Sequence, residues 1–177
     1  MNVSMIYSPG EKELKLCLRA VWVTMGKNQE PQNPVSDALL ENLLTARHSP
    51  IRVLNFAFLL EGIPSNIATH LARHVHAVPF VSSLRNDRQD RMDGDLAPRN
   101  TPVDMIFYCN AEELMIVANK RLCNKASAQT QEAVRMMCDC VVKKFPVFEK
   151  LLVPMCMYHG GVCHEIVPCY KNFSKGE

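Results

Sequence analysis

The chain has 177 residues, of which 47% are apolar and 21% are charged, and this is the composition of an ordinary globular protein. The length favours one domain over two and allows a substantial buried core. Lys and Arg number 20 and Asp and Glu 18, so the net charge is only +2, which argues against a nucleic-acid polymer as partner. A disordered tail, a collagen and a coiled-coil rod are excluded.

No segment predicts membrane association or export. The longest apolar stretches, such as residues 53–60, are much shorter than the ~20 residues that cross a bilayer. The N-terminal residues lack the basic and long apolar regions of a signal peptide. We therefore expect a cytoplasmic protein with no membrane partner, whose eight cysteines are reduced thiols or ligands rather than disulfides.

The first half of the chain predicts strands and helices in alternation, from the period of its apolar residues. The clearest strand signal is the alternation of Phe56, Phe58 and Leu60. In chain order we first expect a strand over 2–7, a helix over 11–25 and a helix from the N-cap Ser36 through Leu44. A strand over 51–61 and a turn over 62–64 follow, and then a helix over 65–76 stopped by Pro79 and extended chain over 80–85.

The second half predicts a polar loop and two long helices. The loop covers residues 86–102, one helix runs from the cap Asn110 to about 122, and another runs over 127–145 until Pro146. Together these elements predict an α+β fold in which a small antiparallel sheet packs with helices. We expect a domain over 1–152 and a Cys/His-rich tail over 153–177.

Residues 73–85 hold the densest group of side chains suited to chemistry. Arginine grips phosphate with two parallel hydrogen bonds. On a strand, Ser83 and Arg85 would point the same way and meet one ligand together. The alternative interpretation is an exposed salt-bridge cluster, because most such charge pairs contribute little.

This segment resembles the signature R-H-R-x-x-S-x-x-x-x-S-x-R of the flavin-dependent thymidylate synthases, the ThyX family. Four fixed positions match, at Arg73, His74, Ser83 and Arg85, and two depart, at Val75 and Val78.

A second block supports the resemblance. It consists of an Asn110-Ala111 pair that opens a helix ending at Arg121, after which residues 119–146 align with the family's last long helix without a gap. The resemblance covers roughly residues 2–146.

The resemblance implies an α+β homotetramer whose active sites are built from several subunits. The implied reaction is reductive methylation of dUMP at C5 to dTMP, with FAD as cofactor and NADPH and methylenetetrahydrofolate as co-substrates. A fixed guanidinium at the pyrimidine ring would stabilise the developing negative charge without a protein nucleophile. The residues implied are Arg121 as the catalytic group at the uracil; His70, Arg73, Ser82, Ser83, Arg85 and Arg121 for substrate binding; and Arg73, His74 and Asn110 for FAD.

Departures from the family pattern leave two alternatives open: a relative that acts on another pyrimidine nucleotide, and a nucleotide-binding module that has lost flavin chemistry. Val75 removes a cation from the flavin phosphates, and Val81 replaces a polar residue. Gly94 stands where the family has a nucleotide-binding arginine, for which the candidate replacements are Arg88, Arg91 and Arg99.

The tail carries a separate possibility. A tetrahedral zinc site is chemically reasonable for its thiols and imidazole, although the cysteine spacings are not a standard zinc pattern. Reduced, partly buried thiols are the main expectation, and the metal or redox interpretation is the minor one. The residues concerned are Cys156, His159, Cys163 and Cys169.

Overall fold

A four-stranded antiparallel sheet with strand order β1-β2-β4-β3 forms the centre of the molecule. The structure, a computed structural model, describes residues 1–88 and 94–169. The strands are β1 (Asn2–Tyr7), β2 (Asn55–Pro64), β3 (Ala77–Val81) and β4 (Pro102–Asn110). The helices are α1 (Glu11–Thr24), α2 (Asp37–Thr45), α3 (Ser65–Ala72), α4 (Ala111–Arg121), α5 (Ala128–Lys144) and α6 (Met155–Tyr158). The expected α+β fold is confirmed.

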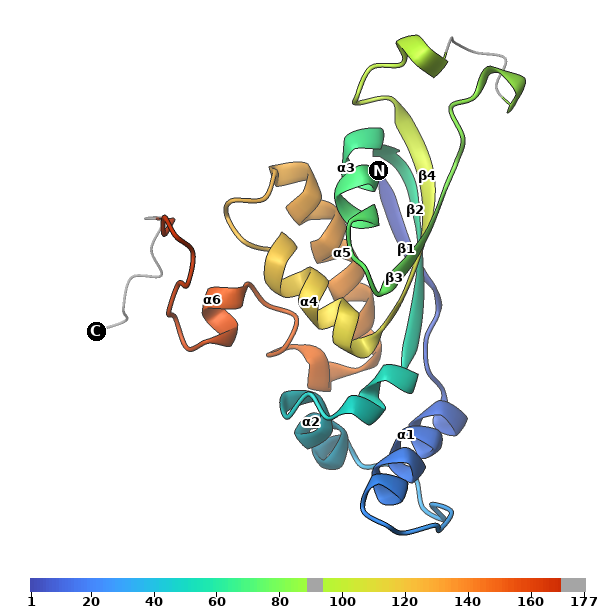
Figure 1. Ribbon diagram of the computed structural model, residues 1–177, viewed down its shortest axis with the longest axis vertical. Helices are drawn as coiled ribbons and strands as arrows, with labels where there is room; N and C mark the ends of the chain where they lie inside the picture. The colour runs from blue at the N-terminus through green and yellow to red at the C-terminus, as the bar shows by residue number, and fades with distance from the viewer. Residues whose placement is uncertain (89–93, 170–177) are drawn as a thin grey trace.

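Helices cover only one face of the sheet (Figure 1). Helices α3, α4 and α5 all pack on that side, over a core that includes Phe58 of β2 and Phe107 of β4. On the opposite face, Val78 and Phe80 of β3 are 48% and 61% exposed. The sheet therefore has one buried face and one apolar face open to solvent.

The second strand differs from the prediction at both ends. Pro50 opens a 3-10 turn over Ser49–Val53, so β2 begins only at Asn55. It then continues through the expected turn to Pro64, with a register shift between Leu60 and Ile63. Gly62 takes a φ of +63° there, and its N–H donates to Asp104 Oδ1 at 2.8 Å. The glycine thus marks a bulge rather than the end of the strand.

The segment after β2 also differs from the prediction. Helix α3 ends at Ala72, four residues earlier than expected, and Pro79 lies inside β3 opposite Phe107. A proline is tolerated there because β3 is at the edge of the sheet, where one N–H is not needed for pairing. The extended segment begins at Ala77 and ends at Val81, not at Arg85.

Strand β4, which pairs with both β2 and β3, was not predicted from the sequence. Its signal is present, because every second side chain faces the core and is buried. The buried set is Val103, Met105, Phe107 and Cys109.

The predicted helix starts are confirmed at three caps. The side chains of Ser36, Asn110 and Ser127 accept hydrogen bonds from the backbone N–H groups of the third residue along. Such caps satisfy N–H groups that have no partner within the helix. Helices α1 and α5 also lie within one or two residues of the expected bounds.

The beginning of the tail is tied to α4 and to the segment before β2. Buried Asn119 donates from Nδ2 to the Val153 carbonyl at 2.7 Å, and its Oδ1 accepts from Arg47 Nη2 at 2.6 Å. The Arg47 guanidinium lies 4.7 Å from the ring centre of Tyr158 in α6. Among the described residues, no helix is long and apolar enough to span a membrane.

Candidate functional site

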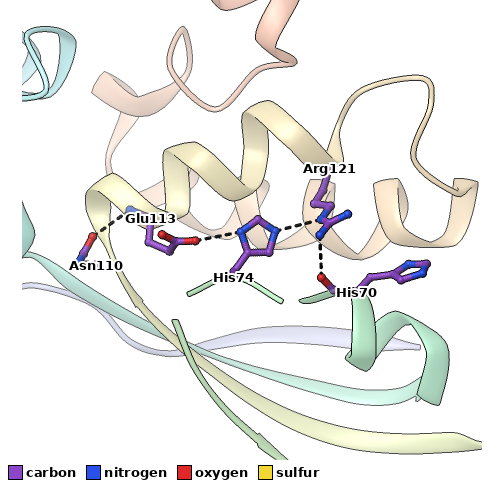
Figure 2. Close-up of polar contacts among 5 residues, drawn as sticks. All are labelled: His70, His74, Asn110, Glu113 and Arg121. Atoms are coloured by element: carbon purple, nitrogen blue, oxygen red, sulfur yellow. Dashed lines mark hydrogen bonds and ion pairs between the residues drawn. The ribbon is translucent and has the colours of Figure 1, made fainter. Parts of the chain in front are cut away.

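The histidine of the signature segment lies buried between an acid and an arginine of α4 (Figure 2). His74 is 6% exposed, and its Nδ1 lies 2.9 Å from Oε1 of Glu113, which is 3% exposed. On the other side of the ring, Arg121 Nε donates to His74 Nε2 at 3.0 Å. Arg121 Nη2 donates to the His70 carbonyl at 2.9 Å. We call Glu113, His74 and Arg121 the buried relay.

Local sequence explains this arrangement. The Asn110 side chain accepts from the Glu113 N–H at 2.9 Å and so fixes the first turn of α4. Glu113 and Arg121 are about two helical turns apart and therefore share one face of α4. His74 follows directly after the C-cap of α3, where its N–H donates to the Leu71 carbonyl. The Glu113 carboxylate, on the first turn of α4, contacts His74.

The hydrogen bonds fix the tautomer of His74. A guanidinium can only donate, so His74 Nε2 must be the acceptor. The ring proton of the neutral imidazole is then on Nδ1 and is donated to Glu113. Burial, and then the charges of Arg121 and Lys120, lower the pKa of His74 to about 4. His74 is therefore neutral at pH 7.

The surroundings of Glu113 and Arg121 also shift the pKa values of these two side chains. Burial raises the pKa of Glu113, against the charges of His76 and Lys120, which lower it. Burial and the charge of Arg73 lower the pKa of Arg121 from its usual value. Arg121 still carries its charge at neutral pH, because arginine titrates far above that range.

A pocket of about 280 Å³ is lined by two arginines and by His70, whose carbonyl accepts from Arg121 of the relay. Across the described parts of the chain, the guanidinium groups of Arg73 and Arg99 have no hydrogen-bond or ion-pair partner. The backbone of Arg99 is held in place, because its carbonyl accepts from Ser65 Oγ at 2.8 Å and from the Asn66 N–H at 3.0 Å. Two unpaired guanidinium groups in one pocket favour an anion such as phosphate. The lining residues are Ser65, Asn66, Thr69, His70, Arg73 and Arg99.

Arg99 was one of three candidates to replace the arginine expected at position 94, and it is the one that the structure brings beside Arg73. A Cβ on Gly94 would lie 2.0 Å from the Leu84 carbonyl oxygen, so no larger residue fits there without rearrangement. Arg88 lies in the short turn Asn86–Arg88, outside this pocket. Arg91 lies outside the described residues.

Arg121 itself lines a second pocket, of about 500 Å³, between the end of α4 and the tail. Lys120 and Lys125 also line it, and the Lys125 ammonium lies 3.3 Å from the Glu165 carboxylate. The tail thus closes one side of the space that Arg121 faces. The thiols on its wall are those of Cys123, Cys156, Cys163 and Cys169.

The predicted pairing of Ser83 and Arg85 on one strand face is wrong, because β3 ends at Val81. Ser83 Oγ instead accepts from the Arg85 N–H at 3.2 Å within a turn. The Arg85 guanidinium makes two 2.9 Å hydrogen bonds to Asp87. Ser82 Oγ accepts from the Asp104 N–H at 3.0 Å and extends the edge of the sheet.

The residues that the family resemblance implies for FAD are less free to bind a ligand than Arg73 and Arg99 are to bind a phosphate. His74 is buried with both ring nitrogens engaged, and Asn110 uses its side-chain oxygen as a helix cap. Only Arg73 of the three offers an open cation, and Val75, where the family has arginine, is an 87% exposed apolar side chain.

The zinc site considered for the tail is not formed in this structure. In residues 1–88 and 94–169, no three His, Cys, Asp or Glu side chains lie together as metal ligands. All eight cysteines are free thiols. Cys156 and Cys163 share a pocket wall, whereas the imidazole of His159 packs edge-on against Tyr158 and His164.

Neither a known family model nor a curated protein matches the sequence. Solved structures do match the fold. Thymidylate synthase ThyX from Helicobacter pylori, with FAD and dUMP, superposes with a TM-score of 0.69 at 17% identity, over 86% of this chain and 99% of that chain. The UMP/dUMP methylase PolB from Streptomyces cacaoi, bound with 5-Br dUMP, gives a TM-score of 0.65 at 17% identity, over 86% and 96% of the two chains. The chain therefore has the ThyX fold.

Proposed function

We propose that this protein is a divergent enzyme of the flavin-dependent thymidylate synthase type, which binds dUMP and methylates C5 of its ring to form dTMP. The observation that carries the proposal is the pair of unpartnered arginines, Arg73 and Arg99, in a pocket that is also lined by His70, whose carbonyl accepts from Arg121. In this proposal FAD is the cofactor, and NADPH and methylenetetrahydrofolate are co-substrates.

The chain's own residues would bind and polarise the nucleotide. Arg73 and Arg99 hold the phosphate, and His70 lies on the wall of the same pocket. Arg121, fixed through Nε and Nη2, has Nη1 without a partner in the described structure and directs it to the pyrimidine ring. A guanidinium at the ring stabilises negative charge as C5 becomes nucleophilic. FAD, when bound, would supply the hydride chemistry.

The remaining predicted residues would reach the nucleotide from a neighbouring subunit. Ser82, Ser83 and Arg85 follow the end of β3, and the segment over 82–88 leaves the sheet on the side away from α4 (Figure 1). The open sheet face supports assembly, since exposed apolar patches mark interaction surfaces. We propose a homotetramer in which this face is buried. Its exposed apolar side chains include Val78, Phe80, Ile106 and Tyr108.

A second candidate function is a nucleotide-binding module without flavin chemistry. The exposed Val75 and the buried, engaged ring of His74 favour it, because both remove groups that would hold a flavin. In this alternative the two-arginine pocket still binds a nucleotide. A relative that acts on another pyrimidine nucleotide would share that pocket too.

The first experiment is a visible spectrum of the purified protein, followed by titration of FAD with and without dUMP. A bound-flavin band near ~450 nm that changes when dUMP is added supports one shared site. Formation of dTMP from dUMP, NADPH and methylenetetrahydrofolate would then establish the reaction. Binding of dUMP without FAD would favour the nucleotide-binding module, and binding of neither ligand would overturn both candidates. Deoxyuridine is the matched control, because it lacks the phosphate.

A further inference from the structure

We propose that Glu113 is a positioning residue, which acts through the His74 ring to hold the Arg121 guanidinium in its nucleotide-binding orientation. This inference rests on the proposed role of Arg121. Glu113 itself is 3% exposed, so it acts without touching the nucleotide.

The first step of the argument is that the carboxylate selects one tautomer of His74. At 2.9 Å from Nδ1, Glu113 stabilises the form that carries its proton there. In that form Nε2 has a lone pair to offer. In the other tautomer Nε2 carries a hydrogen, which would face the Nε hydrogen of Arg121, and the two donors would repel.

The second step is that this lone pair fixes Arg121. Arg121 Nε donates to it at 3.0 Å, while Nη2 donates to the His70 carbonyl at 2.9 Å. Two anchors from different elements hold the guanidinium plane, and this leaves Nη1 for a ligand. A charge held in advance costs no reorganisation when the nucleotide binds.

The third step is that no other charged group in the described parts of the chain is placed to substitute for Glu113 in this role. The charged groups that face the relay are His76 and Lys120 beside Glu113, Arg73 beside Arg121, and Glu112 one residue away. Lys120 and Arg73 have only donor groups and cannot accept the His74 proton, and the His76 side chain is exposed. The Glu112 carboxylate is engaged with Arg52.

Three variants test the role of Glu113. Glu113→Leu removes the acceptor and keeps similar bulk, Glu113→Gln keeps an acceptor oxygen without the charge, and Glu112→Gln is the matched control on the same turn. We expect dUMP affinity, measured by calorimetry, to fall about tenfold in E113L, as for loss of a charge-assisted hydrogen bond. It should recover to within about threefold of the wild type in E113Q and stay unchanged in E112Q.

A second readout does not depend on nucleotide binding. ¹⁵N–¹H correlation spectra of the histidine rings, with the His74 signals assigned by their loss in His74→Gln, report the tautomer directly. We expect Nδ1–H at pH 7 in the wild type and in E113Q, and loss of that preference in E113L. Arg121→Ala should keep Nδ1–H, since Glu113 still accepts the proton.

The two readouts separate the possible failures. Wild-type His74 that carries its proton on Nε2, or both protons, at pH 7 would overturn the relay even if E113L did not fold. A normal tautomer together with unchanged dUMP affinity in folded E113L would also overturn it. A wild type that binds no dUMP would overturn the proposed function, whereas the spectra would still decide whether Glu113 sets the tautomer.

Discussion

The buried relay and the segment over 82–88 both present an arginine, but they hold it in different ways. Arg121 is fixed by a buried imidazole and a backbone carbonyl from other parts of the fold. Among the described residues, the Arg85 guanidinium is held by Asp87 alone, two residues away, and the side chains of this pair are 68% and 56% exposed. The Arg121 guanidinium is thus held in place before a ligand binds, whereas the Arg85 guanidinium must give up its contact with Asp87 to bind a ligand.

This difference has an energetic consequence. An exposed ion pair contributes only about 0–1 kcal/mol, so a phosphate displaces Asp87 from Arg85 at little cost. The contacts of Arg121 are partly buried, and disturbing them leaves the buried His74 ring without a partner. We therefore expect substitutions in the relay to have larger effects than substitutions in the segment over 82–88.

The largest effect is expected for Arg121→Ala. Because it removes the charge proposed to stabilise the developing negative ring, kcat for dTMP formation should fall about 100-fold or more. Arg135→Ala, a change at an exposed arginine of α5, is the control and should retain normal turnover. Full activity of R121A would contradict the site assignment.

A smaller effect is expected from pH. The pKa of His74 is about 4 in the folded protein, against about 6.5 when the chain is unfolded, so the unfolded state binds more protons between these values. The stability from His74 is therefore complete above about pH 6.5 and is lost as the pH falls towards 4, by up to about 3 kcal/mol. The raised pKa of Glu113 acts in the opposite direction and reduces the net loss.

Urea denaturation at several pH values between 7 and 4.5 measures this dependence. The unfolding free energy of His74→Gln should vary less with pH than that of the wild type. His164→Gln, at an exposed position in the tail outside the relay, should behave like the wild type. Parallel curves for the wild type and H74Q would show that His74 does not titrate as its burial requires.

The relay and the segment over 82–88 also differ in how far the sequence predicted them. The Asn110 cap and the end of α4 at Arg121 follow from local signals, so the ends of that helix were predicted well. The contact of Glu113 with His74 depends on where the fold places α4 relative to the segment that follows α3, and no local pattern encodes it.

Errors elsewhere have similar physical causes. Ser83 and Arg85 were predicted to share one strand face, but the pairing of β3 with β4 ends at Val81, and beyond it Ser82 still bonds to Asp104. The alternation of Phe107 and Cys109 in β4 was available and was overlooked. Arg99 could only be offered as one of three candidates, since the loop that carries it closes on Ser65 through tertiary hydrogen bonds.

An intermediate effect is expected at the two-arginine pocket. Arg73→Ala and Arg99→Ala should each weaken dUMP binding about tenfold, because each removes a charge-assisted contact to phosphate. Binding of deoxyuridine should not change in either variant. Arg19→Ala, at a surface arginine paired with Glu30, is the matched control. Equal losses for dUMP and deoxyuridine would mean that these arginines do not meet the phosphate.

The smallest effect is expected at the exposed pair. Asp87→Asn leaves Arg85 without its ionic partner and should strengthen dUMP binding by about two- to threefold, within the range of one surface ion pair. The gain should shrink at high salt, which screens exposed charges. In the double variant with Arg85→Ala the gain should vanish, because it depends on the released guanidinium. A gain that persists without Arg85 would mean that Asp87 repels the phosphate directly, and Arg85 would then lose its place in the binding site.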